Sequence, residues 1–295
     1  MQNKSIGFIG TGVMGKSMVK NLQQAGYTVH VFTRTETKAV SLVEDGAIWE
    51  KSVANLARVT DIIITMVGDP RDVEDVYFGP HGILENAREG TYVIDMTTSK
   101  PSLAKEIFNE ATRNHLYALD APVSGGDIGA KNGTLSIMVG GEQHVFDTLL
   151  PLFNTLGENI ILQGPAGAGQ HTKMSNQITI ASNMIGVSEA VIYAKQAGLD
   201  PIRVLDSITT GAAGSWSLTN LAPRMIKGDF DPGFYVKHFI KDMNIAIESA
   251  QEMGLKTPGL ELALSLYQEL AELGGNDWGT QALIQVLANE MENIH

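Results

Sequence analysis

The hydrophobic residues in the first half of the chain fall into short runs separated by segments with helical spacing. Five runs are rich in valine and isoleucine and bounded by glycine, aspartate or asparagine, which predicts buried parallel strands. They are Ser5–Ile9, Thr28–Arg34, Asp61–Val67, Thr91–Met96 and Leu116–Leu119. Between them, segments such as Lys16–Ala25 and Ser102–Arg113 are expected to be helices. Strands that alternate with helices predict right-handed crossovers and a doubly wound sheet.

Two further strands are expected before the pattern changes. Apolar positions alternate with a period of two in Thr134–Val139, which predicts a half-buried strand near the end of the sheet. Asn159–Leu162 is expected to be the last strand of this domain. We therefore predict an α/β fold whose first domain, residues 1–164, is a Rossmann-type, mostly parallel sheet.

The rest of the chain is predicted to be helical. No proline occurs between about residues 168 and 197, and Gly198 and Pro201 then supply a stop. A helix of about 30 residues is about 45 Å long, so we expect it to join the two domains. Further helices are predicted at Pro201–Thr209, Lys241–Glu252, Gly259–Leu273 and Gln281–Glu290. The second domain, residues 165–295, is thus expected to be all-α.

Composition narrows the class of protein. The 295 residues include no cysteine, which excludes disulfides, thiolate metal sites and cysteine nucleophiles. A net charge of −12 disfavours a nucleic acid partner. The chain shows neither a signal peptide nor an apolar run of the ~18 residues that a membrane helix needs. The seven histidines are scattered without ligand spacing, so we expect no metal. These observations predict a cytoplasmic protein without a membrane partner.

A glycine-rich loop follows the first predicted strand and opens a helix. It contains G-x-G-x-x-G at Gly10, Gly12 and Gly15. In a dinucleotide-binding fold these glycines permit a tight turn, the approach of a pyrophosphate and close helix packing. The helix N-terminus adds N–H groups and a positive dipole. A glycine-rich turn without a ligand is the alternative. The predicted pyrophosphate contacts are Gly10, Thr11, Gly12, Val13, Met14 and Gly15.

The end of the second predicted strand indicates which cofactor binds. NAD-binding versions place aspartate or glutamate there, to bond the ribose hydroxyls. This chain has Thr33, Arg34 and Thr35 at that place, with Lys38 a turn further on. An arginine suits a 2′-phosphate, and the threonines can donate hydrogen bonds to it. We therefore predict NADP rather than NAD; a solvated Arg34 is the alternative.

Two further segments carry polar groups that could contact a substrate. Ser124, Gly125 and Gly126 offer a hydroxyl and unhindered N–H groups, which suit a carboxylate, although an ordinary turn has the same composition. On the predicted long helix, Lys173 and Asn176 are three residues apart and share a face. Burial disfavours the charged form of a lysine and suits it to proton transfer near neutral pH. A lysine whose stem covers apolar surface is the alternative.

Together these motifs resemble the β-hydroxyacid dehydrogenase family, which includes 3-hydroxyisobutyrate dehydrogenases, tartronate semialdehyde reductases and glyoxylate/succinic semialdehyde reductases. The resemblance extends over nearly the whole chain. Four ordered motifs carry it: Gly7–Gly15, Asp120–Gly141, Gly169–Asn176, and Lys241–Asp242 followed by Ala246.

The resemblance implies a role for each matching residue. Lys173 matches the catalytic lysine that gives or takes the proton of the reacting oxygen, and Asn176 matches its hydrogen-bonding partner. Ser124, Gly125 and Gly126 match the loop that holds the substrate carboxylate.

The resemblance also implies cofactor contacts. These are Val67 after the third predicted strand, Thr98 after the fourth, and Lys241 near the nicotinamide. Two positions depart from the pattern: Gln177 stands where many members have asparagine, and Arg34 replaces the acidic residue of NAD-preferring members.

The reaction that the resemblance implies is hydride transfer between NADP(H) and a short 3-hydroxy acid or semialdehyde, or a 2-oxo acid. A homodimer or homotetramer is also implied. An imine reductase and a catalytically silent NADP-binding module are the alternatives, and Lys173 argues against both. Four other residues could line the pocket for the substrate tail or simply pack: Ser215, Trp216, Lys237 and His238.

Overall fold

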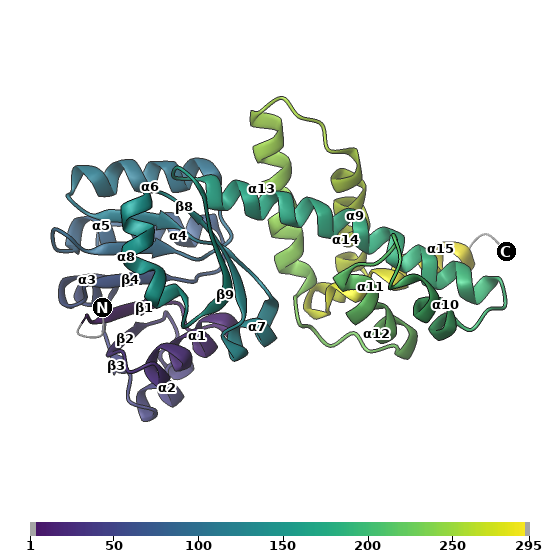
Figure 1. The fold of residues 1–295 in the computed structure, drawn as a ribbon, viewed down its shortest axis with the longest axis horizontal. Coiled ribbons are helices and arrows are strands. Elements are labelled where there is room, and N and C mark those ends of the chain that lie inside the picture. The colour runs from purple at the N-terminus through teal and green to yellow at the C-terminus, as the bar shows by residue number, and fades with distance from the viewer. Residues whose placement is uncertain (1–3, 293–295) are drawn as a thin grey trace. The chain divides into compact units, whose positions relative to one another are not determined.

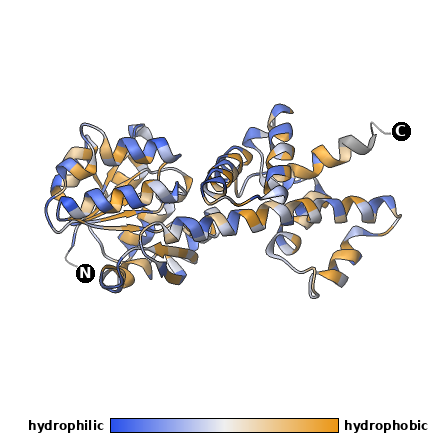
Figure 2. Cartoon of the chain, turned by 90° about the horizontal axis from the view of Figure 1, so that it is seen from above, coloured by the Kyte–Doolittle hydropathy of each residue, from blue (hydrophilic) through white to orange (hydrophobic). Residues whose placement is uncertain are grey.

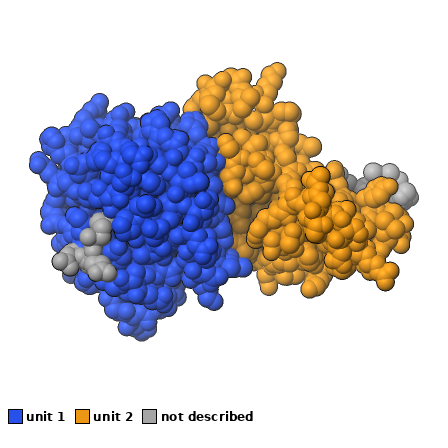
Figure 3. Space-filling model, in the orientation of Figure 1, with its two compact units in different colours: residues 1–173 blue, residues 174–295 orange. Residues whose placement is uncertain are grey.

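The computed structural model describes residues 4–292, which form two compact units that divide after Lys173 (Figure 3). The strands of the first unit are β1 Ile6–Ile9, β2 Val29–Phe32, β3 Ile48–Trp49, β4 Ile62–Thr65, β5 Tyr92–Asp95, β6 Tyr117–Asp120, β7 Val123–Ser124, β8 Leu135–Gly140 and β9 Gly157–Gly164. Its helices are α1 Val13–Gln24, η1 Glu36–Lys38, α2 Val40–Glu44, α3 Val53–Val59, α4 Pro70–Phe78, α5 Ile83–Asn86, α6 Pro101–Arg113, α7 Gly126–Asn132 and α8 Gln143–Phe153. The long helix α9, Ala168–Gln196, begins in this unit and continues into the next (Figure 1).

The nine strands form one mostly parallel sheet, as the sequence predicts. Their order is β3-β2-β1-β4-β5-β6-β8-β7, with β9 parallel to β8. Within residues 4–292, the antiparallel pairs are those of β8 with β6 and with β7. Strand β1 lies between β2 and β4, so the chain changes direction across the sheet there. Such a switch point, at the carboxyl ends of the strands, is where α/β sheets bind ligands.

Burial on both faces explains why the parallel strands were recognisable. All four residues of β4 are buried. Ile62 and Ile64 pack in the same core cluster as Met18 of α1, whereas Ile63 packs on the other face with Leu56 of α3. A strand covered by helices on both sides must be apolar at consecutive positions, which yields an unbroken run of isoleucine.

The structure corrects two sequence-based expectations and adds two strands that the sequence pattern does not predict. The predicted half-burial of residues 134–139 is wrong, because Ile137, Met138 and Val139 of β8 are all buried. Both faces of β8 are therefore covered, and Met138 supplies an apolar side chain on the face that was expected to be exposed. Strands β3 and β7 were not predicted, because two residues are too few for a pattern. The helix expected at residues 281–290 is divided into a 3₁₀ turn, Thr280–Leu283, and a helix, Ile284–Glu292.

The second unit is helical, as predicted. After α9 it contains α10 Pro201–Ile208, α11 Trp216–Asn220, α12 Ala222–Lys227, α13 Val236–Glu252, α14 Pro258–Glu272, η2 Gly275–Asp277, η3 Thr280–Leu283 and α15 Ile284–Glu292. Phe239 of α13 and Tyr267 of α14 meet edge to face in its core, with ring centroids 5.0 Å apart. Helices throughout the chain combine hydrophilic and hydrophobic residues (Figure 2). Within residues 4–292, no helix has the length and apolar character needed to cross a membrane.

Candidate active site

The glycine-rich loop between β1 and α1 has the geometry of a pyrophosphate cradle. Gly10 adopts a φ of 100°, and a Cβ there would lie 2.2 Å from the carbonyl oxygen of Met66. A Cβ at Gly15 would lie 2.0 Å from the carbonyl oxygen of Gly10. At Gly12 a Cβ would meet nothing within 4 Å, so the backbone is open to a ligand. Helix α1 starts directly after Gly12 without a side-chain cap, which leaves its first N–H groups to an anion.

The other predicted residues of this edge differ in exposure. Thr11 is buried, and its Oγ1 has no hydrogen-bond partner, whereas Val13 is exposed. Met14 packs against the core of the sheet. Thr33 is half-buried and Thr35 is exposed after β2. The unpartnered Thr11 hydroxyl and the exposed Thr35 are therefore polar groups of this edge, whereas Val13 adds an exposed apolar side chain.

The predicted 2′-phosphate ligand Arg34 is paired with a carboxylate that the sequence analysis did not identify. Arg34 Nη1 lies 2.8 Å from Asp72 Oδ1, and Nη2 donates to Asp72 Oδ2 at 3.2 Å. The Arg34 side chain is nevertheless 80% exposed. Lys38, at the end of η1, is also exposed. Two cations therefore lie close together in sequence after β2, one of them beside an anion.

The loops after β4 and β5 are joined by buried polar groups. The N–H of Val67 donates to Thr97 Oγ1 at 3.0 Å. Asp95 Oδ1 accepts from Thr65 Oγ1 at 2.8 Å and from the N–H of Thr97 at 3.0 Å. Burial raises the pKa of Asp95 to about 6, with a smaller contribution from the charge of Asp120, although the hydrogen bonds from Thr97 and Thr65 oppose the rise. This carboxyl group therefore holds the ends of two strands together and is costly to ionise.

The start of α9 is fixed to the same edge by Asp120, the last residue of β6. Asp120 Oδ1 accepts from the N–H of Gly167 at 2.7 Å, and Oδ2 accepts from the N–H of Gln170 at 2.8 Å. Both oxygens thus bond N–H groups at a helix N-terminus, where a negative charge is stabilised. Burial nevertheless raises the pKa of Asp120. Gly169 packs so closely that a Cβ would lie 2.3 Å from the carbonyl oxygen of Met138.

The side chain of Gln170 bridges α9 to the loop after β5. Its Nε2 donates to the carbonyl oxygen of Thr97 at 2.7 Å, and its Oε1 accepts from the N–H of Ser99 at 2.9 Å. Thr98, a predicted cofactor contact, lies between these two residues and is half-buried. Gln170 itself is fully buried. The amide thus fixes the backbone on both sides of Thr98.

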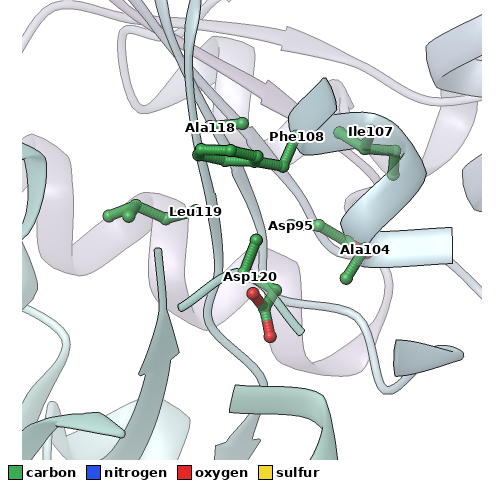
Figure 4. A pocket seen from close by; sticks show the side chains of 8 residues that line it. Asp95, Ala104, Ile107, Phe108, Ala118, Leu119 and Asp120 are labelled. Atoms are coloured by element: carbon green, nitrogen blue, oxygen red, sulfur yellow. The ribbon is translucent and has the colours of Figure 1, made fainter. Parts of the chain in front are cut away.

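A small cavity lies beside this network (Figure 4). Its volume is about 10 Å³, about the space of one water molecule. Asp95 and Asp120 both contribute to its wall, from the ends of adjacent strands. The remaining lining residues are Ala104, Ile107, Phe108, Ala118, Leu119 and Ala166. Apart from these two carboxyl groups, the side chains that line the cavity are apolar. Burial is the main cause of the raised pKa of both groups.

Lys173 lies one turn after Gln170 on α9. Because residues three apart lie on one helix face, Lys173 follows the side that Gln170 presents to the loop after β5. Its side chain is buried, with 7% exposure. An ammonium group is strongly hydrated in water, so a lysine held in this way needs polar partners. Lys173 is therefore a buried lysine, unlike one on a helix face that is exposed to solvent.

The predicted substrate loop joins a short strand to a helix. Ser124 is half-buried and pairs with Ser136 across β7 and β8, so it lies in a strand rather than a turn. Gly125 and Gly126 have φ values of 131° and 63°, which L-residues rarely adopt. A Cβ at Gly125 would lie 3.2 Å from Leu135 Cδ2. The backbone conformation of this loop, and hence the direction of its N–H groups, therefore depends on glycine at both positions.

A second polar chain lies within the helical unit. Asn176 Nδ2 donates to Gln177 Oε1 at 2.7 Å, and Gln177 Nε2 donates to Asp242 Oδ2 at 2.6 Å. Lys241 Nζ lies 3.0 Å from Asp242 Oδ1. Because a carboxylate only accepts, Asp242 orients the Gln177 amide and, through it, the Asn176 amide. Asn176 and Lys241 are therefore linked by two residues to which the sequence analysis gave no role.

The four residues left open as pocket candidates have different local surroundings. Ser215 caps α11, accepting from the N–H of Leu218 at 3.0 Å. Lys237 Nζ donates to Asp277 Oδ1 at 2.5 Å, and Trp216 is exposed. Burial lowers the pKa of His238, and the charges of Lys241 and Lys237 add to this effect.

Comparisons with known proteins agree with this architecture. Residues 5–164 match the family model described as the NAD binding domain of 6-phosphogluconate dehydrogenase. Residues 167–287 match the model described as NAD-binding of NADP-dependent 3-hydroxyisobutyrate dehydrogenase. Together the two models extend over nearly all of the chain.

Relatives along the full length narrow the assignment. The chain is 41% identical to 2-hydroxy-3-oxopropionate reductase of Escherichia coli (strain K12), covering 96% of each protein. It is 50% identical to probable 3-hydroxyisobutyrate dehydrogenase-like 1 of Arabidopsis thaliana, covering 97% of this chain and 85% of the relative. A solved 3-hydroxyisobutyrate dehydrogenase of Mycobacterium tuberculosis, with L-serine, superposes with a TM-score of 0.90 at 30% identity, covering 96% and 99% of the two chains. The chain therefore belongs to the β-hydroxyacid dehydrogenase family and is an NAD(P)-dependent oxidoreductase that acts on CH–OH groups.

Proposed function

We propose that the protein transfers a hydride between NADP(H) and a short 3-hydroxy acid or semialdehyde, or a 2-oxo acid, with Lys173 as the general acid and base. The observation that carries this proposal is the burial of Lys173 one turn after the bridge that Gln170 makes to the loop around Thr98. A buried lysine at the carboxyl edge of a dinucleotide-binding sheet is suited to proton transfer, whereas a lysine without a chemical role is usually exposed to solvent.

The residues at this edge fit a dinucleotide. The open backbone at Gly12 and the uncapped start of α1 suit a pyrophosphate. Arg34, Thr33, Thr35 and Lys38 supply donors for a 2′-phosphate. The backbone at Val67 and the Thr98 hydroxyl are further proposed contacts of this edge. The family resemblance implies one more contact, Lys241 of the helical unit. When bound, the nicotinamide supplies or accepts the hydride.

In this mechanism Lys173 stabilises the negative charge on the reacting oxygen and exchanges a proton with it. During reduction the carbonyl oxygen becomes negative, and the Lys173 ammonium stabilises that charge and delivers the proton. During oxidation the neutral amine takes the proton of the hydroxyl group. The polarity imposed by Gln177 leaves Asn176 Oδ1 as the acceptor end of its amide, which suits a bond from a hydroxyl or an ammonium.

The Ser124 loop is proposed to hold the substrate carboxylate. The Ser124 hydroxyl and the N–H groups of Gly125 and Gly126 are donors near the start of α7. Fixing the carboxylate orients the reacting carbon of the substrate relative to the nicotinamide, which lowers the entropic cost of hydride transfer. We further propose a cytoplasmic homodimer or homotetramer, as the family resemblance implies.

The test is a Lys173→Ala variant assayed for NADPH oxidation with glyoxylate, succinic semialdehyde and tartronate semialdehyde, and for the reverse reaction with 3-hydroxyisobutyrate and L-serine. We expect kcat to fall by about 10²–10⁴-fold, while NADPH binding measured by fluorescence titration is unchanged. Lys195→Ala is the matched control, because Lys195 is an exposed lysine of the same helix. Lys173→Ala with near-normal kcat refutes the assigned role. Activity with none of these compounds, but with a cyclic imine, favours the imine reductase alternative.

A further inference from the structure

The ion pair between Arg34 and Asp72 occupies the place where a 2′-phosphate is proposed to bind. Each terminal nitrogen of the guanidinium faces one carboxylate oxygen, at 2.8 Å and 3.2 Å. A phosphate binds arginine through the same kind of paired N–H bonds. The carboxylate of Asp72 therefore uses the donors that an incoming phosphate needs.

Asp72 is held more firmly than its partner. It lies in the first turn of α4, where the helix dipole favours a negative charge. The N–H of Gly68 donates to Asp72 Oδ2 at 3.2 Å, and a Cβ at Gly68 would lie 2.6 Å from that oxygen. Glycine at position 68 is thus what lets the carboxylate lie against the loop after β4. The Asp72 side chain is 18% exposed, against 80% for Arg34.

These observations have an electrostatic consequence. Before a cofactor binds, the charge of Arg34 is largely balanced by an anchored anion. A 2′-phosphate, with a charge of about −1.5 to −2, must share the guanidinium with that anion and lie within a few ångströms of it. A ribose hydroxyl carries no charge and suffers neither effect.

We propose that Asp72 is a specificity-determining residue that weakens the binding of a 2′-phosphorylated cofactor and so reduces the preference of this enzyme for NADP over NAD. The inference rests on the proposed role of Arg34 as the 2′-phosphate ligand. Arg34 attracts the 2′-phosphate, and the negative charge of Asp72 reduces the net attraction. Arg34 is mostly exposed to solvent, which screens its charge, so the expected effect is about two- to fivefold in affinity.

The test uses Asp72→Asn, which keeps an acceptor for the Gly68 N–H and removes the charge. Adenosine 2′,5′-bisphosphate and AMP serve as probes, with dissociation constants measured by calorimetry at low salt. We expect Asp72→Asn to bind the bisphosphate about two- to fivefold more tightly and AMP as before. The gain should shrink as ionic strength rises. Glu74→Gln is the matched control, since Glu74 is an exposed acid of α4 on a different face.

Arg34→Ala separates this inference from the cofactor proposal. If Arg34→Ala leaves the affinity for the bisphosphate unchanged, the proposed role of Arg34 is wrong. If Arg34→Ala weakens the bisphosphate but Asp72→Asn leaves it unchanged or weakens it, the role of Asp72 is wrong and that of Arg34 stands. Equal tightening of AMP and bisphosphate, or an equal gain in Glu74→Gln, would show a general charge effect and overturn the inference. In the Arg34→Ala background, Asp72→Asn should favour the bisphosphate less than it does when Arg34 is present, because only the direct repulsion between the carboxylate and the phosphate is then removed.

Discussion

Replacing Asp95 with asparagine tests whether ionisation of this buried carboxyl group lowers the free energy of unfolding. Asp95 is buried, and its Oδ1 accepts from Thr65 and Thr97. Its pKa rises from 3.8 to about 6, because burial disfavours ionisation more than the hydrogen bonds favour it. An asparagine keeps the Oδ1 acceptor and never ionises. Asp95→Asn is therefore expected to stabilise the first unit at alkaline pH.

The sign and size follow from proton linkage. Between pH 3.8 and about 6 the folded protein binds a proton that the unfolded chain has released, so stability falls as pH rises through this range. Above it the penalty is complete and amounts to about 3 kcal/mol. Asp95→Asn should recover up to that amount at pH 8 and little near pH 4. The new Nδ2 group needs acceptors of its own, so about 3 kcal/mol is an upper limit.

Urea unfolding at pH 4.5 and pH 8 measures this difference, with Trp49 fluorescence reporting on the first unit after Trp216 and Trp278 are replaced by phenylalanine. Asp75→Asn, at an exposed position, is the control and should change stability by no more than about 0.5 kcal/mol at either pH. A variant at position 95 that is less stable than the parent at pH 8, or whose advantage is the same at both pH values, would refute the reasoning.

Two other substitutions test how α9 is attached to the sheet. Gly169→Ala should destabilise by about 1–3 kcal/mol in thermal unfolding, because its Cβ would overlap the Met138 carbonyl oxygen, whereas Gly186→Ala on the same helix meets nothing and should stabilise by about 0.5–1 kcal/mol. Gln170→Leu should cost about 2–5 kcal/mol and lower kcat, since it strands the buried Thr97 carbonyl and Ser99 N–H; unchanged stability and kcat would contradict the proposed bridge.

The sequence reveals the strands whose burial leaves a pattern. Ile62–Thr65 is apolar because helices cover both of its faces, and that signal survives without any tertiary information. The two residues of β3 and of β7 are too few to show a period. In β8 the apparent alternation misled, because serine and methionine at every second position resemble a solvent face although Met138 is buried.

The candidate site was predictable to the extent that its chemistry is local. Gly10, Gly12 and Gly15 lie within six residues, so their roles follow from one turn and one helix. The partner of the Arg34 side chain is 38 residues away along the chain, and the partners of the Gln170 side chain are more than 70 residues away. Such pairs arise because parallel strands bring their carboxyl ends to one edge, and no local pattern records which side chains then meet.

Two polar networks fix different parts of helix α9, which carries both the proposed general acid Lys173 and its proposed partner Asn176. Asp120 and Gln170 fix the first turn of α9 to the sheet, just before Lys173. Asp242, through Gln177, fixes the amide of Asn176 within the helical unit. Along the helix axis, three residues separate the lysine and the asparagine by only about 4.5 Å. Because α9 is continuous over these residues, the helix itself sets the spacing of Lys173 and Asn176 along the backbone.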